Sequence, residues 1–78
     1  MVATLLGSRV LDFVADDGSK IKGTQLFVSF NEDGVTGQAA DKLFVKDGME
    51  IPAKLAPGMK VEIDINRKGK VEGVYIPQ

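Results

Sequence analysis

A phenylalanine stands between two lysines in the segment DKLFVK, residues 41–46. Side chains alternate between the two faces of an extended strand, so Lys42, Phe44 and Lys46 share one face. An aromatic ring can stack on an unpaired base, and flanking ammonium groups can meet the phosphates on either side of it. This spacing makes the three residues candidates for binding a single strand of nucleic acid, either DNA or RNA.

The segment QLFVSF, residues 25–30, also places a ring on its polar face. Leu26 and Val28 would face a core, whereas Phe27 would lie on the outer side between a glutamine and a serine. An apolar ring on a polar face is the informative exception in an alternating strand. The alternative is that Phe27 and Phe44 pack in a minor core or a dimer interface. The chain would then be a protein–protein adaptor or a small dimeric structural protein.

Five further side chains could extend this surface. Arg9 could do so from the first strand, and Tyr75 from the last, where its ring could stack on a base or pack against the protein. Lys22 follows the turn DDGS, whose aspartates could neutralise it. Arg67 and Lys68 form the tip of the turn NRKG, which is either a solvated turn or a contact to a phosphate backbone.

Catalytic chemistry has little support in this composition. Histidine and cysteine are both absent, which removes the usual general base, the thiol nucleophile and the commonest metal ligands. Ser8 therefore has no histidine to activate it, and DDGS lacks the ligand spacing of a calcium loop. We expect no catalytic residues, no metal site and no cofactor, and the chain is not predicted to be an enzyme.

The charge is nearly balanced, with 10 Lys and Arg against 11 Asp and Glu. A nucleic-acid binder usually carries an excess of basic residues, so binding here has to come from a local patch. Residues 54–70 hold five basic side chains against two acidic ones. No basic segment followed by a long apolar run is present, so no signal peptide or membrane span is predicted and the expected location is cytoplasmic.

Turn residues interrupt the chain about every 8–12 residues, a spacing typical of all-β sandwiches and barrels. In the clearest alternating segment, Val61, Ile63 and Ile65 should face a core. Gly7 and Gly23 are expected to bend or bulge a curled sheet. The alternation predicts five strands, at residues 4–14, 21–30, 41–46, 59–65 and 70–76.

The chain is therefore expected to form one domain over residues 1–78, an all-β, small five-stranded antiparallel barrel that is OB-fold-like. A generic five-stranded sandwich and an SH3-like barrel are the alternatives. A chain of 78 residues buries only about 60% of its unfolded surface, so a homodimer or a bound ligand is expected to add stability.

The order of features along the chain carries a family resemblance. A strand ends in an Asp–Gly hairpin, a strand with an outward aromatic and a glycine-rich loop follow, and then comes LAPGMKVEIDINRKGKVEGVYI. This order resembles the small phage- and plasmid-encoded single-stranded-DNA-binding proteins of the filamentous-phage gene V type. The resemblance implies an OB-like barrel, a homodimer and cooperative coating of single strands. It implies stacking by Phe27, Phe44 and Tyr75, and phosphate contacts by Arg9, Lys22, Lys42, Lys46, Arg67 and Lys68.

A second resemblance rests on MEIPAKL followed by APGMKVEIDINRKGKVEGVYI. This stretch is similar to the swapped-hairpin transcription regulators of the AbrB type, in which Ile-Pro, a short helix and Gly-x-x-Val-Glu-Ile follow one another. Only AKLA separates Pro52 from Pro57, which is too short for that helix. The gene V-type resemblance is therefore favoured.

Overall fold

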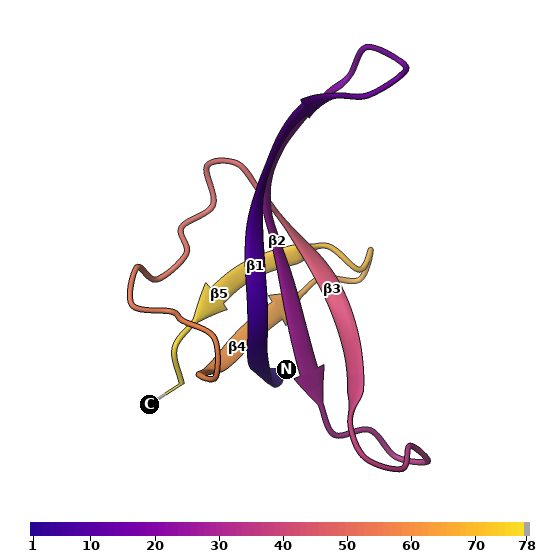
Figure 1. Ribbon diagram of the computed structural model, residues 1–78, viewed down its shortest axis with the longest axis vertical. Helices are drawn as coiled ribbons and strands as arrows, with labels where there is room; N and C mark the ends of the chain where they lie inside the picture. Colours follow the sequence, from indigo (N-terminus) through magenta and orange to yellow (C-terminus); the bar gives the residue numbers. More distant parts are fainter. Residues whose placement is uncertain (78) are drawn as a thin grey trace.

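The computed structural model describes residues 1–77, which form one five-stranded antiparallel sheet (Figure 1). The strand order is β3-β2-β1-β4-β5, so β1 lies at the centre and pairs with both β2 and β4. The all-β antiparallel architecture and the five strands predicted from the sequence are confirmed. The strands are β1 (Val2–Val14), β2 (Lys20–Phe30), β3 (Ala39–Lys46), β4 (Lys60–Ile65) and β5 (Val71–Tyr75).

The sheet curls but does not close into a barrel. Its two edges, β3 and β5, approach each other, yet no ladder of hydrogen bonds joins them within residues 1–77. A hollow lined by Phe44 and Lys46 of β3 and by Val71 and Glu72 of β5 lies between these edges. The five-stranded antiparallel sheet predicted from the sequence is therefore present, but the expected closed barrel is not.

A bulge bends β1 near its start. Leu5 lies opposite Val28 and Gly7 lies opposite Phe27, so Leu6 is an extra residue with no partner of its own. A bulge of this kind bends the strand and increases its local twist, as the sequence predicts for Gly7. No bulge is present at Gly23, because its pairing register with β1 and β3 is regular.

The core lies inside the curl of the sheet. Val61 and Ile63 of β4 are fully buried, as their alternation predicts. Ile65, expected in the same row, pairs with the buried Val71 but is 41% exposed at the end of β4. The buried apolar residues are Ala3, Leu5, Leu26, Val28, Val45, Val61, Ile63, Val71 and Val74.

The β1–β2 hairpin extends past the rest of the molecule as a two-stranded ribbon (Figure 1). We call residues 12–22 the arm, because the β3 pairing of β2 begins at Gly23. Its tip is ordered by the Ser19 N–H, which donates to the Asp17 carboxylate at 2.9 Å, and this bond lowers the pKa of Asp17. Phe13 is 50% exposed and Val14 is 62% exposed, so the arm adds little to the core.

Replacing Ile63 by alanine should lower the free energy of unfolding by about 2–5 kcal/mol, because the substitution leaves a cavity at a fully buried position. Urea unfolding followed by circular dichroism measures this change. Val35→Ala, in the exposed loop between β2 and β3, is the control and should change stability by less than about 0.5 kcal/mol. Equal effects of the two substitutions would contradict the core described above.

Candidate nucleic-acid interface

Strand pairing brings five of the predicted site residues onto one face of the sheet. Residues directly opposite each other on neighbouring antiparallel strands share a face. In one row, Arg9 of β1 lies opposite Gln25, which lies opposite Phe44 of β3. In the next row, Phe27 lies opposite Lys42. We call the outer-face set of Arg9, Phe27, Lys42, Phe44 and Lys46 the platform.

Two contacts hold the side chain of Arg9 in place within the platform. Its Nε donates a hydrogen bond to Gln25 Oε1 at 2.8 Å, and its guanidinium carbon lies 5.8 Å from the centre of the Phe27 ring. Such a cation–π contact is attractive by about 0.5–1 kcal/mol at an exposed site. Phe27 is therefore half-buried and covered in part by Arg9, whose remaining N–H groups can still donate to a phosphate.

Phe44 is the more accessible ring, with 42% of its surface exposed. The ring lies across the backbone of Gly23 on the neighbouring strand. A Cβ at position 23 would be only 2.6 Å from Phe44 Cζ and would also clash with the Val45 carbonyl oxygen. Glycine inside a strand often marks such a close approach. The lack of a side chain at Gly23 therefore leaves room for the Phe44 ring. The sequence analysis expected a bend or bulge at this glycine.

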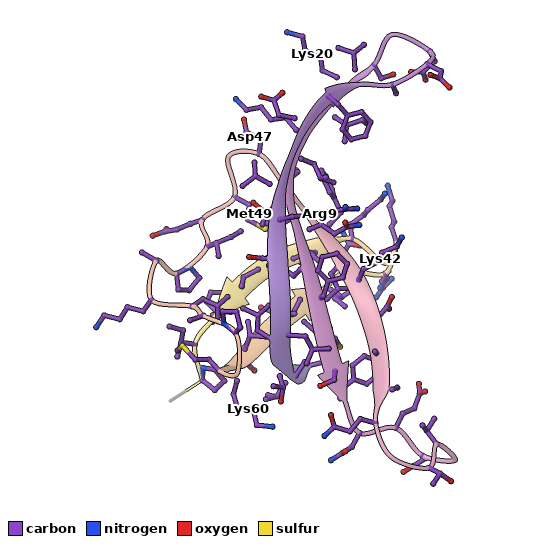
Figure 2. All side chains as sticks on the ribbon, in the orientation of Figure 1. Arg9, Lys20, Lys42, Asp47, Met49 and Lys60 are labelled. Carbon is purple, nitrogen blue, oxygen red and sulfur yellow. The ribbon has the colours of Figure 1, made fainter. Side chains whose placement is uncertain are left out.

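Lys42 and Lys46 flank Phe44 along β3, and both are exposed. Side chains two residues apart on one strand face lie about 7 Å from each other along the strand. The carboxylate that precedes Lys42 in the sequence, that of Asp41, belongs to the opposite face because Asp41 pairs with Val28. The outer side of β3 thus presents an aromatic ring between two positive charges. Figure 2 shows Arg9 and Lys42 at the middle of the sheet, with Lys20 and Lys60 toward its two ends.

Two predicted site residues lie away from the platform. Lys22 is on the opposite face, directly across from Asp12, and its Nζ lies 3.8 Å from an Asp47 carboxylate oxygen. Tyr75 lies on β5 opposite Glu62, with its ring packed across Gly73. Neither residue therefore shares the row of rings and cations formed by the platform.

The β4–β5 turn lies beside β3 (Figure 1), and its Asn66 and Lys70 line the same hollow as Phe44 and Lys46. Asn66 Oδ1 accepts hydrogen bonds from the backbone N–H groups of Lys68 and Lys70 at 2.9 and 3.0 Å, which fixes the turn. Arg67 and Lys68 are exposed at its tip. This side-by-side placement is what a backbone-contacting turn next to a stacking surface requires.

A groove of about 740 Å³ separates the turn from β3. Phe44 and Lys46 of β3 line one wall of the groove. The groove is also lined by Met49, Asn66, Lys70, Val71 and Glu72. The sequence analysis did not identify Met49 or Glu72, because the groove depends on how closely β5 approaches β3, which no local pattern encodes. We call this hollow the seam groove.

No three acidic side chains within residues 1–77 gather closely enough to hold a metal ion. In the same part of the chain, no helix is long and apolar enough to cross a membrane.

No protein-family model, curated protein or solved structure matches the chain. The gene V-type resemblance therefore rests on the sequence pattern alone. A function has to be argued from the chemistry of the platform and of the seam groove.

Proposed function

We propose that the protein binds single-stranded nucleic acid, with single-stranded DNA as its main ligand, and that it catalyses no reaction. The observation that carries this proposal is the position of Phe44, exposed over Gly23 and flanked by Lys42 and Lys46. Bases of a single strand stack on such a ring, while the ammonium groups meet the neighbouring phosphates. Arg9 and Phe27 extend the same surface by one strand.

Single strands fit this surface better than a duplex does. A ring can stack only on a base whose face is available, and duplex bases are already stacked on each other. The net charge of −1 gives the whole chain no general attraction for DNA, so affinity has to come from the local cations. Binding of this kind is sequence-tolerant on the platform and sensitive to salt.

The fold offers support by analogy. In OB-type barrels, the face of strands 2 and 3 and the loop between strands 4 and 5 bind oligonucleotides or oligosaccharides. Here the platform spans β1, β2 and β3, and the β4–β5 turn lies beside it. One fold can serve many functions, so this likeness is supporting evidence and the proposal rests on the chemistry of the platform.

Phe44→Ala should weaken binding of a fluorescent oligo-dT by about 5- to 150-fold, because one stacked base contributes about 1–3 kcal/mol. Fluorescence anisotropy at low salt measures the dissociation constant, and circular dichroism checks that the fold is retained. Tyr75→Ala removes another half-exposed ring away from the platform and should weaken binding less. Saturable binding that survives Phe44→Ala unchanged would exclude the platform as the stacking surface.

Lys42→Gln should flatten the salt dependence of binding. The logarithm of the binding constant of a single strand falls with the logarithm of salt concentration with a slope of about −0.7 for each phosphate contacted. Removal of one contact should therefore reduce the slope by about 0.7. The control is Lys20→Gln, near the tip of the arm (Figure 2), which should leave the slope unchanged. The same slope for both variants would show that Lys42 contacts no phosphate.

We also propose a homodimer in which two copies meet along β1. β1 pairs with β4 only over Val2–Thr4, so its edge beyond Leu5 has no strand partner within residues 1–77. Leu6, Val10 and Val14 are all more than half exposed along this edge. An exposed apolar edge favours pairing with another strand, and two identical edges can pair antiparallel about a two-fold axis.

Val10→Lys should shift the protein from dimer to monomer in sedimentation velocity, because lysine on an edge strand opposes strand addition. Val35→Lys places the same charge in the exposed loop of residues 31–38 and should leave the dimer intact. A wild-type protein that sediments as a monomer over a broad concentration range would refute the dimer. It would leave the proposal for DNA binding standing.

A further inference from the structure

We propose that the seam groove is a base-reading subsite that prefers guanine to thymine, and that Glu72 sets this preference. The inference rests on the proposed binding of single-stranded DNA and goes beyond it, because stacking on Phe44 alone does not distinguish one base from another. Phe44 belongs to both the platform and the groove. A strand that stacks on this ring therefore passes directly along the groove mouth.

The walls of the groove suit a flat aromatic ligand. Phe44, Met49 and Val71 supply an aromatic ring, a thioether and an aliphatic side chain. The volume of about 740 Å³ falls in the range of about 300–1,000 Å³ that is common for small-ligand sites. Apolar walls with a few polar groups at fixed positions are the usual form of such a site.

The charges at the groove suit a nucleotide within a strand. Lys46 lies on the β3 side and Lys70 on the side of the β4–β5 turn. Phosphates on either side of an inserted base can each meet one ammonium group. Two lysines and one glutamate line the groove, so it keeps a positive balance even with the Glu72 carboxylate present. An anionic strand is therefore not repelled from it.

Glu72 is exposed and lines the groove. The Lys22–Asp47 pair is the one ion pair in the part of the chain that the structure describes, so Glu72 is not paired with Lys46 or Lys70 even though they line the same groove. An ionised carboxylate has two oxygen acceptors and no donor. Guanine presents two adjacent donors, N1–H and the N2 amino group, which match these two oxygens.

Thymine gives the opposite pattern. Its single N3–H donor lies between two carbonyl oxygens, and each of these would face a carboxylate oxygen. Asn66 adds a donor for the other side of the base. Its Oδ1 is occupied by two backbone N–H groups of the turn, which leaves its NH₂ group for an acceptor such as guanine O6. The groove therefore combines two acceptor oxygens with one donor group, a set that guanine complements.

The experiment compares three oligonucleotides of equal length by fluorescence anisotropy. One is oligo-dT, the second has isolated guanines among the thymines, and the third carries hypoxanthine in place of those guanines. We expect the guanine-containing strand to bind about 5- to 150-fold more tightly than oligo-dT, the range for one bidentate contact to a base edge. Hypoxanthine lacks the N2 amino group and should lose most of this preference.

Glu72→Gln should reduce the guanine preference to less than about 2-fold, while binding of oligo-dT by the platform persists. Glu62→Gln is the matched control, because Glu62 is an exposed carboxylate of β4 that does not line the groove. Equal affinities of the wild type for all three strands, or an unchanged preference in Glu72→Gln, would overturn this inference and leave the proposed function intact. Failure of all three strands to bind would overturn both.

Discussion

One extra residue in β1 decides which side chains share a surface. Leu5 points into the core opposite Val28, and regular alternation would also direct Arg9 toward the core side. The bulge at Leu6 reverses this parity, because a shift of one residue moves all following side chains to the other face. Arg9 then joins Phe27 and Phe44 on the outer face. The place of Arg9 in the platform thus depends on a local irregularity in the strand at the centre of the sheet.

The same bulge separates two parts of the chain with different stability. Residues before it pair on both edges and contribute Ala3 and Leu5 to the core, whereas the arm beyond it is a ribbon of two strands. A two-stranded ribbon is marginally stable in water without packing on one face. The arm should therefore open more readily than the curled sheet. A second copy along β1 would supply the packing that the arm lacks.

The sequence was sufficient for features that depend on local alternation. It predicted five strands, the burial of Val61 and Ile63, and the shared face of Lys42, Phe44 and Lys46, because these follow from a period of two along one strand. The same parity separates Lys22 from Phe27, because the two positions differ by an odd number, although the sequence analysis grouped them in one surface.

Features that depend on two distant segments were not accessible in this way. The seam groove comes from the approach of β5 to β3, and these two strands are not neighbours in the sequence. Closure of the sheet also depends on a pairing that is encoded in neither strand alone. Glu72 lines the seam groove because the turn before it lies beside β3, and no local pattern around Glu72 encodes this placement.

The packing of the Phe44 ring against the backbone of Gly23 affects the thermodynamics of binding. A long side chain that is immobilised at an interface loses about 0.5–1.5 kcal/mol of rotamer entropy. The Phe44 ring already lies against the backbone of the next strand, so most of its rotational freedom is lost during folding. A base that stacks on it meets a surface that is ordered in advance, and little of the stacking enthalpy has to compensate for ordering the protein.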